Sequence, residues 1–211
     1  MALSNVVIDI SHHNGNVDLQ RAAQAGIVGV IHKTTQGTGF ADPKYARNRR
    51  AAAAAGLLWG AYHFGTGADP IAQAKWFLRT ATPGPSDLVV LDFEENTSGG
   101  PTMNLAQARV FIQTVQSATN RASGLYGGSL LRQSLGAKKD PLLGACWLWW
   151  AQFAPSAVIP PNWSAFTLWQ YTDGHHGNPP YEVDGVGPCD RDMYQGPVDQ
   201  LKAAWAKGTL A

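Results

Sequence analysis

The chain has 211 residues, a length that suits one large domain, and only 15 % of them are charged, against roughly 25 % in soluble domains. A hydrophobic fraction of 45 % excludes an intrinsically disordered chain. The net charge of +1 leaves no broad positive field, which excludes nucleic acid as the expected partner. The eight tryptophans favour a carbohydrate ligand, because flat rings with polar edges stack on sugars.

The sequence shows no membrane span and no redox motif. The longest weakly polar stretch, residues 51–62, is shorter than the roughly 18 residues that a span needs. The first residues include neither a charged leader nor an apolar segment with a cleavage site, so we expect synthesis in the cytoplasm without a signal peptide. Cys146 and Cys189 lack C-x-x-C spacing, and we expect buried free thiols, with a disulfide between them as the alternative.

The first two thirds of the chain alternate between β-rich and helical patterns, which predicts βαβ units and a parallel sheet. Helix signals support this: Asp18 precedes one helical run, and Asp69 with Pro70 opens another. The predicted strands cover residues 6–10, 27–33, 57–64, 88–94 and 124–127. The predicted helices cover residues 19–25, 43–55, 71–80, 104–119 and 129–135.

The last third is mainly β. Residues 146–153, 166–171 and 185–194 are typical of strands, and Pro, Gly and Asn rather than helices join them. Eight strands in all predict an α/β fold, a single irregular TIM-like β/α barrel with helices largely missing after the fifth strand. No repeat or linker divides residues 1–211, so we expect one domain.

Polar or aromatic side chains stand at the ends of all eight predicted strands. In a β/α barrel the loops after the strands form the open face that carries the active site, whereas a core built only for packing needs no such residue at every strand end. In chain order these residues are Asp9, Lys33, Tyr62 with His63, Asp92 with Glu94, Tyr126, Trp149 with Gln152, Trp169 with Gln170, and Asp190.

The pair Asp92 and Glu94 points to acid catalysis. Residues two apart on a strand face the same side, so both carboxyl groups should face the barrel mouth. Crowding near Asp9 and Asp190 should leave at least one acid protonated at neutral pH, and glycosidic cleavage needs such a proton donor. Glu94 reaches further and suits the general acid, while the deeper Asp92 suits an orienting role. The alternative is a strand end whose acids cap the next loop.

The spacing of the two acids leaves the stereochemistry open. Cβ atoms two positions apart on a strand lie about 6.5 Å from each other, between the separations expected of carboxyl pairs that retain and that invert configuration.

Several neighbours of these acids are candidates for substrate binding. Lys33 and Tyr62 could donate hydrogen bonds to sugar oxygens, and Trp149, Trp169 and Tyr171 could stack on sugar rings. For each aromatic residue the alternative is packing in the core or at the rim.

Other residues have a structural interpretation. We expect packing roles for Trp150 and Phe153, which are out of phase with Trp149. His63 has the alternative of a core histidine that is fully hydrogen-bonded. The histidine pairs at 12–13 and 175–176 lie in Gly- and Asn-rich loops without metal-ligand spacing, so we expect them to face solvent.

Seven blocks along nearly the whole chain resemble motifs of glycoside hydrolase family 25, the Chalaropsis-type lysozymes. Seven blocks in the right order make coincidence implausible. The blocks are Asp9-Ile10-Ser11 through Gly15 and Asp18, Ile31 to Gly37 with Asp42-Pro43, Gly60-Ala61-Tyr62-His63-Phe64, Leu91-Asp92-Phe93-Glu94, Trp149 to Phe153, Leu168-Trp169-Gln170-Tyr171, and Val183-Asp184-Gly185 through Asp190.

The resemblance implies hydrolysis of the β-1,4 bond between N-acetylmuramic acid and N-acetylglucosamine in peptidoglycan. It implies that Glu94 is the proton donor and that Asp92 assists, by positioning the substrate's own N-acetyl group as nucleophile. Asp9 and Asp190 complete the acidic cleft, and the remaining site residues bind substrate. The implied barrel lacks helices after the fifth strand, as the pattern above predicts. No metal or organic cofactor is implied.

Four positions depart from the family pattern. Gln36 replaces a common Glu, Cys189 a common Val, Asp192 a common Asn, and Phe153 a common Tyr. The changes at Gln36 and Asp192 should alter the charge of the cleft and its pH optimum. None removes a residue to which the resemblance assigns chemistry.

We therefore expect a monomeric muramidase that acts on peptidoglycan glycan strands in the cell wall. A chain without a leader resembles a phage endolysin, released to the wall through a pore, and no separate wall-binding domain is expected. Two rivals are a non-catalytic glycan-binding barrel and a metal-dependent glycan deacetylase that uses Asp9, His63 and Asp92. The first is disfavoured by four intact carboxyl groups, and no spacing requires the second.

Overall fold

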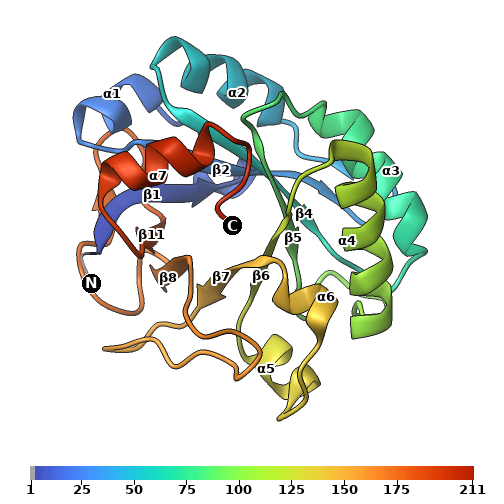
Figure 1. Ribbon diagram of the computed structural model, residues 1–211. Helices are drawn as coiled ribbons and strands as arrows, with labels where there is room; N and C mark the ends of the chain where they lie inside the picture. The colour runs from blue at the N-terminus through green and yellow to red at the C-terminus, as the bar shows by residue number, and fades with distance from the viewer. Residues whose placement is uncertain (1–2) are drawn as a thin grey trace.

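The computed structural model describes residues 3–211, and its main feature is a closed barrel (Figure 1). Strands follow the order β1-β11-β8-β7-β6-β5-β4-β2, and β1 pairs with β2 to close the ring, with the short β3 outside it. The strands are β1 (Ser4–Ile10), β2 (Gly29–Gln36), β3 (Phe40–Ala41), β4 (Leu58–Phe64), β5 (Leu88–Asp92), β6 (Gly124–Gly127), β7 (Trp147–Ala151), β8 (Leu168–Thr172) and β11 (Asp190–Tyr194), with β9 (Glu182–Val183) and β10 (Gly187–Pro188) forming a separate hairpin. The predicted eight-stranded barrel is confirmed.

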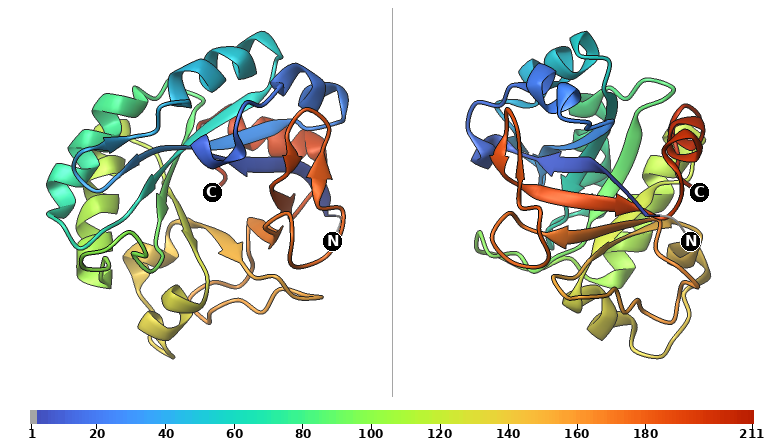
Figure 2. Two further views of the ribbon diagram at one scale, coloured as in Figure 1. Left: turned by 180° about the vertical axis from the view of Figure 1, so that it is seen from behind. Right: turned by 90° about the vertical axis from the view of Figure 1, so that its left-hand side faces the viewer.

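The longer helices lie along the first half of the barrel. Figure 2 shows them on one side, while loops and short helices cover the side that follows β6. The helical elements are η1 (His12–Asn14), α1 (Leu19–Gln24), α2 (Tyr45–Ala54), α3 (Pro70–Ala81), α4 (Leu105–Thr119), α5 (Ser129–Leu135), α6 (Pro141–Gly144) and α7 (Val198–Trp205).

The predicted helix starts have a local cause. Asp18 and Asp69 accept hydrogen bonds from the backbone amides of Arg21 and Ala72, which are otherwise unpaired at a helix start. Pro70 occupies the first helical position, where its missing amide hydrogen costs nothing.

One strand runs against the others, which corrects the sequence interpretation. β11 is antiparallel to both β1 and β8, whereas the other neighbouring barrel strands are parallel. Asp190 therefore begins its strand and does not end it. Because the backbone of Asp190 pairs with that of Asp9, the residue still lies at the open end of the barrel.

Helix α7, which the sequence analysis did not predict, packs against the barrel interior. Its Leu201 and Trp205 are fully buried among the inward-facing strand residues. The Trp205 indole nitrogen donates a hydrogen bond to the carbonyl of Trp59 at 2.9 Å. A Cβ atom on Gly29 would lie 2.7 Å from the Trp205 ring, so only glycine fits there.

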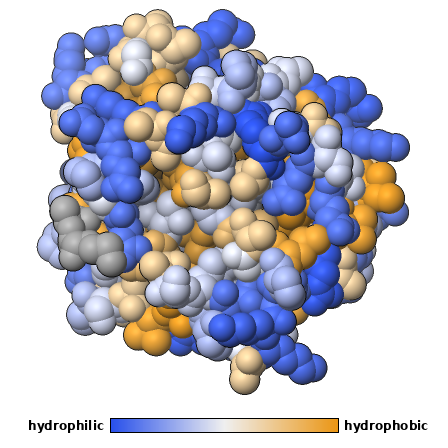
Figure 3. All heavy atoms as spheres, viewed as in Figure 1, coloured by the Kyte–Doolittle hydropathy of each residue, from blue (hydrophilic) through white to orange (hydrophobic). Residues whose placement is uncertain are grey.

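Within residues 3–211, no helix is long and apolar enough to cross a membrane. Hydrophilic and hydrophobic residues are interspersed over the face seen in Figure 3. Cys146 and Cys189 are buried free thiols, so the disulfide alternative is wrong.

Candidate active site

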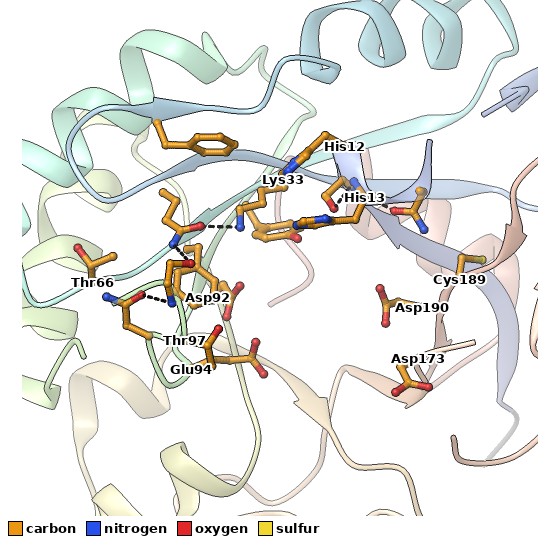
Figure 4. A pocket seen from close by; sticks show the side chains of 18 of the residues that line it. His12, His13, Lys33, Thr66, Asp92, Glu94, Thr97, Asp173, Cys189 and Asp190 are labelled. Atoms are coloured by element: carbon orange, nitrogen blue, oxygen red, sulfur yellow. Dashed lines mark hydrogen bonds between the residues drawn. The ribbon is translucent and has the colours of Figure 1, made fainter. Parts of the chain in front are cut away.

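Four carboxyl groups line one chamber at the open end of the barrel. They are Asp9, Asp92, Glu94 and Asp190, and the chamber encloses about 260 Å³. It adjoins a larger cleft of about 1080 Å³, which shares Asp92, Glu94 and Asp190 with it (Figure 4). The other residues of the chamber, called here the acid chamber, are Tyr62, Tyr126, Trp149, Phe153 and Gln170.

Strand register brings these acids together from distant parts of the chain. Asp92 is the last residue of β5, and its backbone lies between those of Phe64 on β4 and Tyr126 on β6. Glu94 follows two residues beyond the strand and is only partly buried, whereas Asp92 is 5 % exposed. Asp92 therefore lies deeper than Glu94, as expected from the sequence.

Burial raises the pKa of all four acids. The pKa of Asp9 and that of Asp92 are raised well above the usual range, mainly because burial penalises the charged form, with neighbouring carboxylates adding to the effect. Burial also raises the pKa of Glu94, although the nearby Lys33 opposes the shift. The pKa of Asp190 rises to about 7, through burial and then through Asp173 and Glu94. A protonated carboxyl group is therefore available near neutral pH.

One glutamine connects the two sides of the acid chamber. The Tyr126 hydroxyl donates to Gln170 Oε1 at 2.8 Å, and Gln170 Nε2 donates to Asp9 Oδ2 at 2.8 Å. These two bonds fix the orientation of the Gln170 amide, which is 3 % exposed. Tyr126 also packs edge-on against Trp149, with 4.6 Å between ring centroids. The chamber is thus ordered before any substrate enters.

Lys33 lies on β2 in the larger cleft. Its ammonium group donates to Gln36 Oε1 at 2.8 Å and lies 4.8 Å from the centre of the Phe64 ring. Burial lowers the pKa of Lys33, while Asp92 raises it. Asp92 Oδ1 is buried without a hydrogen-bond partner within residues 3–211, so it is free to accept a bond from a ligand.

Two predicted binding residues face away from the acid chamber. His63 is fully buried, with hydrogen-bond contacts to Thr35 and Gln73 and its ring stacked on Phe111. Trp169 is 5 % exposed and belongs to the core between barrel and helices. Adjacent strand residues point to opposite faces of the sheet. Tyr62 and Gln170 face the acid chamber, so their strand neighbours His63 and Trp169 face away from it. The structure therefore favours the core-histidine and core-packing alternatives.

Gln152 and Tyr171 also have structural contacts. Gln152 Oε1 accepts from the Trp150 indole at 2.9 Å and from the backbone amide of Val158 at 2.7 Å, which orders the loop after β7. Tyr171 is fully buried, and its hydroxyl accepts from Asn5 at 2.7 Å. Gln152 lines a neighbouring chamber with Glu94 but not the acid chamber itself.

Three features of the cleft differ from the sequence interpretation. Phe153, expected to pack, is 41 % exposed and lines the acid chamber. His12, expected to face solvent, is half-buried and contacts Asp42 at 2.8 Å. Phe40 on the unpredicted strand β3 lines the larger cleft, as does His12. The place of Phe153 just beyond a predicted strand end could have indicated that it lines the site. The sequence around Phe40 contains no such signal.

The geometry does not suit a metal centre built on Asp9, His63 and Asp92, because His63 lies on the opposite face of β4 from the acid chamber. Within residues 3–211, no group of three or more His, Cys, Asp or Glu side chains is arranged to hold a metal ion.

The comparisons with known proteins identify the family of the chain. Residues 8–178 match the model of the glycosyl hydrolases family 25. The chain belongs to this family. The bacterial lysozyme from Streptomyces coelicolor has a TM-score of 0.82 at 27 % identity, over 98 % of this chain and 99 % of that one. The N,O-diacetylmuramidase of Chalaropsis sp is 27 % identical over 92 % of this chain and 95 % of its own length. An endolysin of known structure has a TM-score of 0.72 at 27 % identity, over 97 % of this chain and 70 % of that one.

Proposed function

We propose that this family 25 enzyme is a lysozyme that hydrolyses the β-1,4 bond between N-acetylmuramic acid and N-acetylglucosamine in peptidoglycan. The observation that carries the proposal is the acid chamber, in which Glu94 reaches the junction with the larger cleft while burial raises its pKa. The likeness to a lysozyme and to a diacetylmuramidase supports the choice of substrate.

Glu94 acts as the proton donor in this proposal. Its carboxyl proton passes to the glycosidic oxygen as the bond from that oxygen to the sugar carbon breaks, and positive charge develops on the sugar. Glu94 suits this role better than Asp92, because it lies closer to the open cleft and is the less buried of the two. Water then adds to the sugar carbon, and its proton returns to the Glu94 carboxylate.

The other acids assist. The unpaired Asp92 Oδ1 accepts a hydrogen bond from the substrate's N-acetyl group and orients it toward the reacting carbon. Asp9 and Asp190 shape the charge of the chamber around the reacting sugar through their raised pKa values, and Gln170 holds Asp9 in place. Tyr62, Tyr126 and Lys33 bind the sugar on either side of the bond. Trp149 is 1 % exposed and supports Tyr126 from behind by edge-on packing.

The biological role belongs to the same proposal. We propose that the enzyme acts at the bacterial cell wall as a monomer, and the likeness to an endolysin supports release from an infected host by a phage. Finding the gene apart from lysis or virion genes would count against the phage role and leave the chemistry unaffected.

The decisive test compares Glu94→Gln with wild type on purified peptidoglycan, with reducing ends counted as they are released. Loss of the proton donor should lower the rate by a factor of about 10²–10⁴. Glu95→Gln is the matched control, because Glu95 is the adjacent acid and is exposed. A rate for Glu94→Gln within a few-fold of wild type refutes the assignment.

Two further measurements on the same substrate distinguish the rival functions. A glycan-binding barrel retains strands in a pull-down but releases no reducing ends. A metal-dependent deacetylase releases acetate and loses activity with a chelator, whereas a carboxylate-based muramidase is unaffected by the chelator.

A further inference from the structure

A second chamber opens beside the acid chamber, between β6, α5 and the end of β7. It encloses about 390 Å³ and shares Glu94, Tyr126 and Phe153 with the acid chamber. We call it the side chamber; its remaining residues are Gly128, Ser129, Arg132, Gln133, Trp150, Ala151 and Gln152. Glu94 and Phe153 therefore lie at the border between the two chambers.

Arg132 on α5 is the cation of this chamber. Its guanidinium group lies over the Trp150 ring, 5.0 Å from the ring centre, which restricts its orientation. The other charged residue of the lining is Glu94, whose pKa is raised by burial. Arg132 therefore supplies positive charge to this part of the cleft.

Arg132 also lacks the acidic partner that three other arginines have. Arg21, Arg49 and Arg109 each contact an aspartate. Within residues 3–211, Arg132 makes no ion pair, and its Nη2 atom is buried without a hydrogen-bond partner. An unpaired buried donor in a native structure calls for an explanation, and a ligand that arrives from the cleft supplies one.

From this geometry we infer that the side chamber is a subsite for a carboxylate carried by the sugar next to the scissile bond, which Arg132 binds while Phe153 contacts the sugar face. The inference rests on the proposed function. A guanidinium fork matches a carboxylate with two parallel hydrogen bonds. Phe153 is 41 % exposed at the border of both chambers, so its ring is accessible to a sugar.

The proposed substrate offers such a carboxylate from two sources. The lactyl group of each N-acetylmuramic acid ends in a carboxylate where no peptide is attached. Where a stem peptide is attached, the carboxylates belong to the peptide. Both sources present the same chemistry to Arg132, and the substrates of the test distinguish them.

The test uses the full chain and three forms of one glycan preparation. The first keeps the stem peptides, the second has them removed so that the lactyl carboxylates are free, and the third has those carboxylates converted to neutral amides. The kcat/KM for release of reducing ends is measured on each form. The kcat/KM of wild type should be about tenfold higher on one of the charged forms than on the neutral form. A tenfold ratio corresponds to the free energy of one charge-assisted hydrogen bond. Which charged form is preferred identifies the source.

Variants then assign the preference to Arg132. Arg132→Gln should reduce the ratio between charged and neutral forms to near one, while Arg132→Lys keeps part of it. Arg79→Gln is the matched control, because Arg79 also lies over a tryptophan, 4.9 Å from the Trp76 ring centre, but on the outer helix α3. The control should keep the wild-type ratio.

An unchanged ratio in Arg132→Gln overturns the inference, and so does a wild type that shows no preference. In both cases wild type still cleaves the strands and the proposed function stands. A wild type that cleaves none of the three forms overturns the proposed function and the inference with it.

Discussion

Asp9 and Asp190 lie directly opposite each other, in the antiparallel pairing of β1 with β11. Burial raises the pKa of both carboxyl groups. The charge of Asp190 adds to the shift of Asp9, and the charges of Asp173 and Glu94 add to that of Asp190, whose pKa reaches about 7. The folded state therefore retains a proton on Asp190 up to about pH 7, whereas the unfolded chain loses it near pH 4.

This difference predicts how stability depends on pH. Because the folded state binds more protons than the unfolded state between about pH 4 and pH 7, the free energy of unfolding should fall as pH rises through that window. Asp190→Asn should reduce the fall, as measured by urea unfolding at several pH values. Asp199→Asn on α7, an exposed site, is the control. An Asp190→Asn variant with the wild-type pH dependence would contradict the assignment.

Asp192, the family departure on β11, is fully buried beneath the site. Its Oδ1 accepts from the Trp149 indole at 2.6 Å, and its Oδ2 is buried with no hydrogen-bond partner in the described part of the chain. Burial raises its pKa well above the usual range. Asp192→Asn keeps the acceptor for Trp149 and removes the titration. We expect a gain in unfolding free energy on the order of 1 kcal/mol at pH 7.

The pH dependence checks the cause of that gain. A raised carboxyl pKa penalises the folded state above the unfolded pKa near 4, so the gain should be larger at pH 7 than at pH 4. Urea unfolding of both proteins at the two pH values measures it. A gain that is equal at both, or a loss at pH 7, would show that the titration of Asp192 is not its source.

The sequence predicted the existence of the barrel strands well because their signals are local. Their bounds were less accurate: β2 runs on to Gln36, past its predicted end at Lys33, and β11 begins at Asp190, after the predicted start at residue 185. β6 was predicted to the residue, since glycines bound its short apolar run. The D-x-E pair at the end of β5 lines the acid chamber. The direction of β11 is set by its partners β1 and β8 and not by its own residues. Helix α7 begins at Val198, and the preceding Pro197 provides no side-chain cap, so the usual start signal is missing.

The direction in which a side chain points, into or out of the barrel, was harder to predict than the strand to which it belongs. Both members of the pairs 62–63 and 169–170 were assigned to the site, but one of each pair must face outward. Which one faces inward depends on the helices behind the sheet: Phe111 on α4 stacks on His63 and leaves Tyr62 for the chamber. Arg132 escaped prediction because its partner ring, Trp150, lies on another element.

Trp169 and Phe153 should respond to truncation in opposite ways. Trp169 is 5 % exposed and its indole donates to the carbonyl of Gln152 at 2.8 Å, so Trp169→Ala should lower the unfolding free energy by about 3–5 kcal/mol. Phe153 is largely accessible, and Phe153→Ala should change stability by less than about 0.5 kcal/mol while raising KM severalfold. Thermal unfolding and peptidoglycan kinetics on both variants decide this. A Trp169→Ala variant that is as stable as wild type but has a raised KM would show that Trp169 binds substrate and is not a core residue.

Gln170 should be the residue whose loss harms both stability and catalysis, because it joins Tyr126 to Asp9. Gln170→Leu leaves two buried polar groups without partners, which should cost about 2–4 kcal/mol of unfolding free energy. It should also lower kcat, since Asp9 loses its orientation. Gln200→Leu, at an exposed position on α7, is the control. Gln170→Glu retains the acceptor for Tyr126 but adds a fifth acid beside Asp9, so its kcat should fall more at high pH than at low pH. If Gln170→Leu is as stable and active as wild type, the connection does not order the chamber.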